Sequence, residues 1–528
     1  MALTITSVAE GSTVTLTLAG RLSAVEAQEF NQTFPGLAQG MQDVLLDFSN
    51  VEYISSMGLR SLFMARKVMT RQGGQIKILN PSPEVMEVFE ATSFDNIITI
   101  IRGSGETATR FYPLRPIQRW MVDTHFMKAK STMMNTGALI RLDPAVDMER
   151  LAGVLNDILA AYDIFRCRLV IHPETGDICQ RFDGEITKVV VETLSDEAFE
   201  QRKQEIKLPY DLIDHSLYRV YLMVTSTAKY FYADFYHAIM DGAALAMLFC
   251  REVDKRYTKP EKFGKNTSQP ASYAEYILEE SQLSEEELRE GHAYWRNMLE
   301  DFDEKRHLPP PDVTGGSETP DHEIEVPFPI IDKHFFRGKN FSENTFFMGA
   351  SLLALAKSAG SREAIMGWVH NGRVTSAERR LMGLMLDQFP IRWDFTEDIT
   401  AEAYLEGLEQ KVKQGMQYRK SLDLVYGEGL EDECATFILQ KGVMGRRGEM
   451  ILCGAEAEIV EMPSNEISAA ENTLDIEMNS HEDGSYSLVL DYDNNLYSEA
   501  AMRRFAEIMK EMVVALQDGD CVVTGLLK

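Results

Sequence analysis

The sequence Tyr236-His237-Ala238-Ile239-Met240-Asp241-Gly242 dominates the interpretation of this chain, because it places a histidine and an aspartate four residues apart. The aromatic-rich stretch 230–236 is typical of a buried strand, and apolar residues recur at helical spacing through 243–257. His237 is therefore predicted to lie on a turn, where an imidazole can face a cavity and transfer protons near neutral pH. The alternative for this pattern alone is a structural histidine whose ring is hydrogen-bonded.

Length and composition exclude several classes of protein. The 528 residues are enough for about three compact units of roughly 100 to 200 residues each, and 45% hydrophobic residues supply their cores. The start MALTITSVAEG lacks a basic segment followed by a hydrophobic core, and no run of about 18 uncharged apolar residues follows, so we expect a cytoplasmic protein without a membrane span. Six scattered cysteines without a CxxC pair predict free thiols, and neither a zinc site nor a disulfide framework. The net charge of −29 disfavours binding to nucleic acid or to an anionic membrane.

The first hundred residues form a self-contained α/β pattern. Two alternating strands surround a turn at Glu10-Gly11, and the pattern continues with a helix over 24–39, a strand over 44–48, a helix over 57–71, a strand over 75–79 and a closing helix over 81–94. The stretch GSGET at 103–107 then predicts a linker. A second irregular stretch at 308–319, with three consecutive prolines, indicates a break between two lobes of the remaining chain.

The run DFSNVEYISSMGLR at 47–60 resembles the STAS domain, the fold of anti-sigma factor antagonists, and the resemblance covers nearly all of residues 1–101. It implies that Ser56 matches the regulatory phosphoserine and that the partner is an anti-sigma-type kinase or another STAS-binding protein. Two positions depart from the family, since Ser55 replaces an acidic residue and Met57 replaces a small hydroxyl residue. Ser56 also has a role that needs no kinase, as an N-cap whose hydroxyl satisfies free amides of the following helix.

From Tyr112 onward the chain resembles the condensation domain of nonribosomal peptide synthetases, a member of the chloramphenicol acetyltransferase-like superfamily. Six partial motifs carry this resemblance in the family's order. They are PLRPIQRW at 113–120, AYDIFR at 161–166, YHAIMDG at 236–242, YAEY at 273–276 followed by AYW at 293–295, MGWVHNGR at 366–373 and GLMLDQFPIR at 383–392.

The two resemblances together imply an α/β and α+β multidomain protein. A STAS domain at 1–102 and a linker at 103–109 precede two chloramphenicol acetyltransferase-like lobes, at 110–290 and 291–528, that meet at a V-shaped cleft. In the family, the donor acyl group arrives as a thioester on the phosphopantetheine arm of an acyl or peptidyl carrier protein, and an amine or hydroxyl attacks it. The resemblance implies no bound cofactor and no metal, and a monomer is expected because both lobes belong to one chain.

The resemblance also assigns roles to the residues of the central motif. His237 accepts the proton of the attacking nucleophile, or orients the nucleophile and steadies the charged intermediate. The amide of Gly242 is a candidate stabiliser of the oxyanion. Asp241 is implied to be structural, in a buried salt bridge with Arg166 of the second motif, because a buried charge without its partner costs several kcal/mol.

Three further residues are candidates for the lining of the cleft. Tyr236 stands where the family has its first histidine, and the alternation of the strand points it away from His237 into packing. Asp387 replaces the family's asparagine, which would bring a carboxylate to the cleft that raises the pKa of His237 or binds an amine acceptor. His370 is expected to reach the same cleft, or to be a loop histidine hydrogen-bonded to the backbone.

The leading hypothesis is a stand-alone condensation-type acyltransferase that forms an amide or an ester, with a STAS module for regulation or recruitment. The chain has no adenylation signature and no carrier-domain serine site, so the activated acyl group must come from elsewhere. The first alternative is a noncatalytic scaffold that binds a carrier or an acyl ligand. The second is a coenzyme A-dependent acyltransferase, which ranks last because no DFGWG-like sequence lies near the C-terminus.

Overall fold

The computed structural model divides the chain into two compact units, Met1–Arg110 and Phe111–Lys528. It describes residues 3–528 apart from 73, 93, 95–97, 102–109, 129–130, 263–269, 301–306, 316–320, 333, 428–433, 442–448, 461–472 and 482. The predicted linker at 103–109 lies outside the described residues, as does part of the irregular stretch 308–319.

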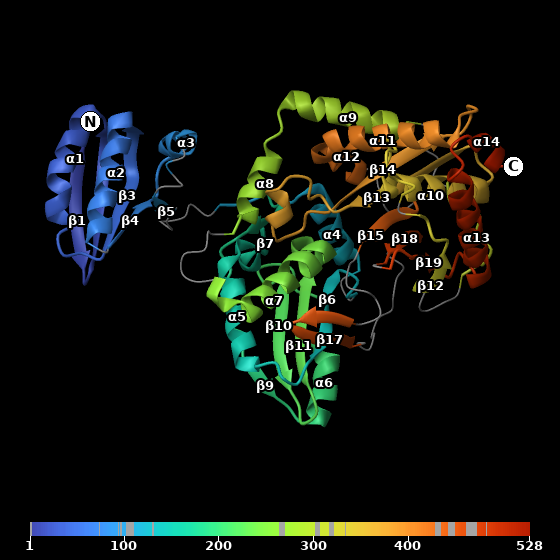
Figure 1. Ribbon diagram of the computed structural model, residues 1–528, viewed down its shortest axis with the longest axis horizontal. Coiled ribbons are helices and arrows are strands. Elements are labelled where there is room, and N and C mark those ends of the chain that lie inside the picture. The colour runs from blue at the N-terminus through green and yellow to red at the C-terminus, as the bar shows by residue number, and fades with distance from the viewer. Residues whose placement is uncertain are drawn as a thin grey trace. The chain divides into compact units, whose positions relative to one another are not determined.

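The first unit is a five-stranded sheet with helices packed against it (Figure 1). The strands follow the order β1 (Thr4–Glu10), β2 (Thr13–Leu22), β3 (Asp43–Ile54), β4 (Gln75–Leu79) and β5 (Thr99–Ile101), and the helices are α1 (Ala24–Leu37), α2 (Ser56–Arg71) and α3 (Pro83–Ala91). β1 and β2 are antiparallel, and the remaining pairs are parallel. Alternate residues of β2 are buried, as expected for a strand with one face on the core. The predicted helices and strands are confirmed, although the closing helix is shorter than the range 81–94.

The second unit contains two six-stranded sheets, each with its own hydrophobic core. The sheet of the first lobe has the order β16 (Glu449–Leu452), β17 (Ala455–Val460), β6 (Asn135–Leu142), β11 (Lys229–Tyr236), β10 (Tyr218–Val224) and β9 (Val191–Thr193), and the lobe also contains a hairpin of β7 (Arg168–Ile171) and β8 (Ile178–Arg181). Its helices are α4 (Pro116–Met127), α5 (Met148–Ala161), α6 (Asp196–Ile206), α7 (Arg251–Thr258) and α8 (Tyr273–Ser281). β11 is central, which explains why its burial is continuous from Phe231 onward.

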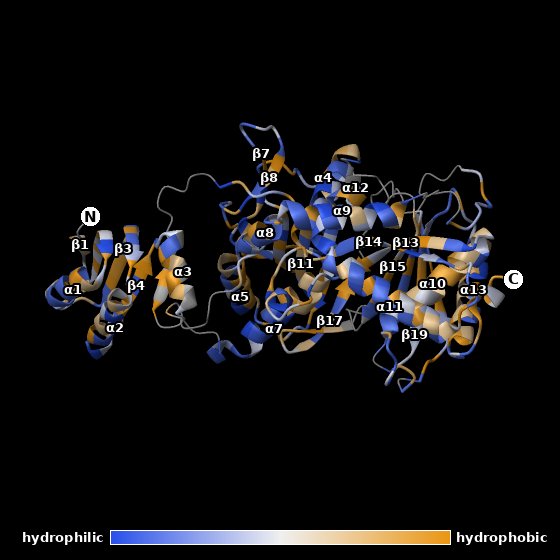
Figure 2. Ribbon diagram, turned by 90° about the horizontal axis from the view of Figure 1, so that it is seen from above, coloured by the Kyte–Doolittle hydropathy of each residue, from blue (hydrophilic) through white to orange (hydrophobic). Residues whose placement is uncertain are grey.

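The sheet of the second lobe has the order β12 (Asp321–Phe328), β19 (Tyr486–Asp493), β18 (Leu474–Ser480), β15 (Thr436–Lys441), β13 (Glu363–His370) and β14 (Asp387–Asp394). Its helices are α9 (Glu285–Leu299), α10 (Glu343–Ala359), α11 (Ala401–Gln417), α12 (Asp423–Gly427), α13 (Glu499–Leu516) and α14 (Val523–Leu526). Every residue of α10 from Thr345 to Ala356 is buried, and hydrophobic residues colour much of this helix in Figure 2. A helix that is apolar on all sides belongs in a core, and α10 packs against α11, α13 and β13.

Segments that follow the second lobe's first elements return to the first lobe. The predicted boundary between the lobes at residues 290 and 291 therefore does not separate them cleanly. The boundary falls inside α9, whose Trp295 belongs to the core of the second lobe. Two later segments return to the first lobe: β17 pairs with β6, and residues 381–385 enter the first core. Leu452 of β16 and Ala457 of β17 are buried in that core.

Two further features of the structure concern the cysteines and the membrane-spanning character of the helices. All six cysteines lie in the described residues, none of them forms a disulfide, and all but Cys521 are buried. Within the described ranges, no helix combines the length and the apolar character needed to cross a membrane.

Candidate functional site

His237 lies where the central strand β11 ends, on a short 3₁₀ turn over His237–Ile239. Its backbone amide donates to the carbonyl of Met134 at 2.8 Å, and its carbonyl accepts from the amide of Met240 at 3.2 Å. The turn is also held from α4, because the side-chain amide of the buried Gln118 donates to the carbonyl of Ala238 at 2.7 Å. The predicted turn is therefore confirmed, and the glutamine of the opening motif is a positioning contact that the sequence analysis did not assign.

The imidazole of His237 is neutral at physiological pH. Burial lowers its pKa from the ordinary 6.5, because desolvation disfavours the imidazolium, and the nearby Asp241 only partly opposes this effect. Its Nδ1 is buried and has no hydrogen-bond partner among the described residues. A neutral imidazole keeps a lone pair that can accept a proton, so the ring is in the state that general base chemistry requires.

Asp241 joins the first lobe to segments that come from the second. Its carboxylate accepts from the guanidinium of Arg373 at 2.9 and 3.0 Å, and from the amides of Met385 at 2.7 Å and Leu386 at 3.2 Å. It also accepts at 2.7 Å from the amide of Ala244, at the start of the helical segment after the motif. Its side chain is 2% exposed and that of Arg373 is 7% exposed. These contacts within the protein support the structural role expected for Asp241.

The prediction that Asp241 forms a salt bridge with Arg166 was wrong. Arg166 does not reach it, because this guanidinium turns to the carbonyl of Gly184 at 3.3 Å instead. The partner is Arg373, at the end of the motif MGWVHNGR, which also donates to the carbonyl of Gly383 at 2.9 Å. The signal available in the sequence was the glycine before this arginine, since a glycine permits a close approach of the backbone.

A glycine is required at position 372 because the backbone there lies very close to the segment around Met385. Its φ of +67° lies in the left-handed region, and a Cβ at this position would stand 1.6 Å from the carbonyl oxygen of Met385. Only glycine fits both conditions. The backbone of 372 and that of the segment around Met385 are therefore packed directly against each other beside the Asp241–Arg373 pair.

Gly242 leaves the other side of the turn open. The residue is exposed, and a Cβ built on it meets no atom within 4 Å. The helix that follows has a π-helical stretch over Ala244–Cys250, a local irregularity that is often found at functional sites. The role expected for the amide of Gly242 toward an oxyanion stays a prediction.

Asp387 does not act as the sequence analysis expected. It is the first residue of β14 and is 3% exposed, and the guanidinium of Arg115 donates to its two oxygens at 2.9 and 3.0 Å. Because this carboxylate is already bound, it is not a free ligand for an amine. The expectation that it raises the pKa of His237 was also wrong, since that pKa is lowered by burial and only Asp241 and the residue's own backbone oppose the effect.

The two remaining candidates in this unit are structural. Tyr236 is fully buried, and its hydroxyl donates to the carbonyl of Met121 at 2.9 Å, so it packs into the core and does not line a cleft. His370 accepts from the amide of Gly372 at 3.0 Å through Nδ1, which is the backbone-bonded alternative. Burial and the neighbouring Arg419 lower the pKa of His370 to about 4, so it stays neutral.

In the first unit, Ser56 is the first residue of α2 and is exposed. The N-cap is Ser55, whose hydroxyl accepts from the amide of Gly58 at 3.2 Å, so the capping role considered for Ser56 belongs to its neighbour. The hydroxyl of Ser56 is consequently not explained by capping.

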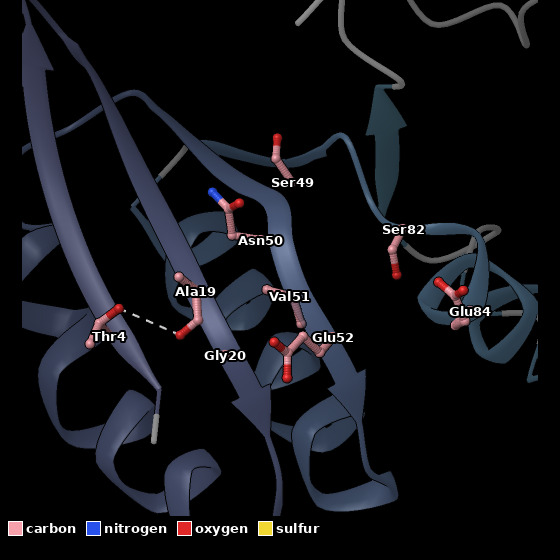
Figure 3. A pocket seen from close by; sticks show the side chains of 9 residues that line it. All are labelled: Thr4, Ala19, Gly20, Ser49, Asn50, Val51, Glu52, Ser82 and Glu84. Carbon is pink, nitrogen blue, oxygen red and sulfur yellow. Dashed lines mark hydrogen bonds between the residues drawn. The ribbon is translucent and has the colours of Figure 1, made fainter. Parts of the chain in front are cut away.

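The first unit also carries a hollow of about 730 Å³ (Figure 3). Its polar lining comes from β1, from β3 and from the residues at the start of α3. The polar side chains are those of Thr4, Ser49, Asn50, Glu52, Ser82 and Glu84. This hollow contains none of the candidate site residues, although residues 49–52 belong to the run 47–60 that resembles the STAS domain.

The fold and site define a two-lobed protein with one neutral histidine on a turn and a buried aspartate–arginine pair behind it. Comparison with protein families matches residues 108–519 to the condensation domain and residues 4–107 to the STAS domain. The chain belongs to the condensation domain family and carries an N-terminal STAS domain.

Curated proteins that are similar to this chain include the large subunits of peptide synthetases. The chain is 20% identical over 326 residues to a subunit of plipastatin synthase from Bacillus subtilis (strain 168), a match that covers 58% of this chain and 12% of that protein. It is 23% identical over 363 residues to a subunit of linear gramicidin synthase from Brevibacillus parabrevis, covering 64% of this chain and 7% of that protein. The chain thus spans a small fraction of these relatives.

Solved structures share the fold of the second unit. The condensation domain from Monacolin K polyketide synthase MokA matches with a TM-score of 0.62 at 18% identity, over 78% of this chain and 99% of that chain. The epimerization domain from the third module of tyrocidine synthetase B matches with a TM-score of 0.61 at 16% identity, over 77% and 97%. A point mutant of the starter condensation domain of rhizomide synthetase RzmA, in complex with C8-CoA, gives 0.60 at 14% identity, over 79% and 98%.

Proposed function

We propose that this protein is an acyltransferase that joins an acyl thioester to an amine or hydroxyl, with His237 as the residue that accepts or orients the nucleophile's proton. The observation that carries the proposal is the state of His237. Its imidazole is kept neutral by burial, and its turn is fixed by contacts from Met134 and Gln118. A base with a fixed position and a free lone pair is what proton transfer in an acyl transfer needs.

Membership of the condensation family supports a carrier-protein thioester as the donor. A coenzyme A thioester is a second candidate, because the similar starter condensation domain was solved in complex with C8-CoA. Either donor brings its own activated thioester. The protein then has only to bind the donor, position the nucleophile and stabilise the oxyanion, for which we propose the amide of Gly242.

The test is intact-protein mass spectrometry of acyl carrier proteins loaded with acyl groups, with a parallel arm that uses acyl coenzyme A. Each donor is incubated with candidate amines and alcohols and with wild type, His237→Ala or His215→Ala. His215 is exposed and lies outside the motif, so it is the matched control. We expect loss of the acyl group into an amide or ester with wild type and His215→Ala, and a rate about 100-fold lower with His237→Ala.

Equal and slow loss of the acyl group with all three proteins would overturn the acyltransferase proposal. In that case, a donor that raises the melting temperature of wild type without being consumed would favour the alternative of a noncatalytic scaffold. Turnover of acyl coenzyme A alone would identify the coenzyme A-dependent alternative.

We further propose that the STAS unit docks a regulatory partner at the start of α2, and that phosphorylation of Ser56 controls this docking. Support comes from the exposure of Ser56 and from α2 itself, which contains four basic residues and no acidic one. A phosphate at the first residue of a helix is compatible with the helix dipole. It would therefore change the surface that a partner meets without melting α2. The test compares the affinity of the STAS-directed kinase from the same genome for wild type and for Ser56→Asp, with Ser7→Asp on β1 as the exposed control.

A further inference from the structure

The segment Gly383–Asp387, which enters the first lobe from the second, is held along its whole length. The carbonyl of Gly383 accepts from Arg373, and the carbonyl of Leu384 accepts from the hydroxyl of Tyr273 at 2.7 Å. The amides of Met385 and Leu386 donate to Asp241. This segment therefore forms the wall against which the carboxylate of Asp241 rests.

Arg115 connects that segment to the first lobe. Its side chain is 3% exposed, and one terminal nitrogen donates to the carbonyls of Leu384 and Leu386, both at 3.2 Å. The other terminal nitrogen donates to both oxygens of Asp387, and it reaches Glu280 of α8 at 3.1 Å. A single guanidinium thus spans two carbonyls and two carboxylates, a geometry that the planar donor fork of arginine permits and an ammonium does not.

The contacts continue from Arg115 to the turn of His237. The carbonyls bound by Arg115 flank the two amides that bind Asp241, and Asp241 in turn binds the amide of Ala244 just beyond that turn. The backbone of Arg115 adds a second connection, because its amide donates to the side-chain oxygen of Gln118 at 2.9 Å. Gln118 holds the carbonyl of Ala238, next to His237.

The cluster brings several buried titratable groups together. Two buried carboxylates share Arg115, with Arg419 as a further cation nearby and the phenols of Tyr273 and Tyr276 beside them. Burial, together with the charge of Glu280, raises the pKa of Asp387 to about 7. Burial also acts on Glu280, but its contacts with Arg115 outweigh that effect and lower its pKa. The hydroxyl of Tyr276 donates to Glu280 at 2.8 Å, which supports the ionised form of that carboxylate.

We propose that Arg115 is a positioning residue for His237: by binding Glu280 on one side and the segment Leu384–Asp387 on the other, it fixes the amides that orient Asp241 and hence the turn that carries the imidazole. The expected effect of Arg115 on kcat rests on the proposed acyltransferase function. Its structural consequence, the geometry around the ring of His237, is independent of turnover.

The experiment compares the full chain as wild type, Arg115→Lys and Arg168→Lys. Because lysine keeps the positive charge at position 115, the variant is expected to fold. An ammonium cannot bind both carbonyls and both carboxylates at once, so the contacts made by Arg115 are only partly retained. Arg168 is the matched control, because it also lies between two carboxylates, Asp183 and Asp214, but with a partly exposed side chain outside the site. The readouts are the nuclear magnetic resonance signal of the His237 ring in histidine-labelled protein, assigned with His237→Gln, and kcat and KM for the donor that wild type uses.

In Arg115→Lys we expect a shifted His237 signal and a ring pKa that moves toward 6.5, with kcat about 100-fold lower and KM little changed, as for a small misplacement of a catalytic group. Arg168→Lys is expected to match wild type in all four quantities. A His237 signal in Arg115→Lys that is indistinguishable from wild type would overturn the proposal, even with a lower melting temperature. If wild type shows no transfer with any donor, the acyltransferase function fails, and the ring signal still decides the positioning role.

Discussion

Asp241→Asn should destabilise the second unit strongly, even though it only replaces one oxygen by an NH₂ group. All the contacts of the carboxylate come from donors: Arg373, and the amides of Ala244, Met385 and Leu386. An asparagine offers one acceptor oxygen, and its NH₂ group then faces donors. The substitution also leaves the guanidinium of Arg373 buried without a counter-charge.

The magnitude follows from these contacts. Breaking a buried ion pair by removing one partner costs about 3 to 5 kcal/mol, and a buried amide that loses its acceptor adds about 1 kcal/mol or more. For a unit as long as Phe111–Lys528, the entropy of unfolding is about 0.9 kcal/mol per kelvin. The total loss of about 4 to 6 kcal/mol therefore corresponds to a melting temperature about 4 to 7 °C lower.

Tryptophan fluorescence during thermal unfolding measures this change in the intact chain. All four tryptophans, at 120, 295, 368 and 393, lie in the second unit, so the signal reports on that unit and not on the STAS domain. Glu499→Gln is the matched control, because Glu499 pairs with Arg503 at 2.7 Å on the surface, where such pairs contribute about 0 to 1 kcal/mol. If Asp241→Asn lowers the melting temperature no more than Glu499→Gln, the reasoning on this buried pair is refuted.

Three further outcomes are expected. Gly372→Ala should prevent stable folding of the second unit, because the new methyl group would overlap the carbonyl of Met385, and tryptophan fluorescence of the purified variant would report it. The rise of kcat/KM with pH should be centred below pH 6.5, because burial lowers the pKa of His237 and the neutral ring is the active form; a centre above 6.5 would contradict this. Ser55→Ala should remove about 1 kcal/mol from the start of α2 and speed hydrogen exchange of its first amides about fivefold, whereas Ser56→Ala should leave exchange nearly unchanged.

The sequence predicts local features of this chain well. The turn at His237 is predicted from the aromatic strand before it and the amphipathic helix after it. These features lie within about thirty consecutive residues, so the prediction needs no information from distant parts of the chain. The same holds for α2, whose predicted start at Met57 differs from the observed start by one residue. The identity of the capping serine was missed, because Ser55 and Ser56 are equally suitable by residue type and only the backbone geometry distinguishes them.

Long-range contacts were predicted less well. Arg166 and Arg373 each end a family-like motif, and either could neutralise a buried aspartate. The choice depends on the path of the chain: the turn at Gly372 brings Arg373 to Asp241, whereas Arg166 is drawn to the carbonyl of Gly184. Likewise, no strand was predicted over 449–460, where β16 and β17 extend the sheet of the other lobe.

Asp387 shows why a departure from a family motif is hard to interpret in isolation. Taken alone, a carboxylate in place of an amide indicates a new charge in the cleft, and this was the expectation. The structure pairs that carboxylate with Arg115, which comes from a motif 272 residues earlier, and buries both side chains. Because removing Arg115 would leave the buried Asp387 and Glu280 without their shared cation, the two positions have to be considered together. The carboxylate at 387 therefore serves as a contact to Arg115 of the opening motif, and the turn of His237 and the Asp241–Arg373 pair are present beside it.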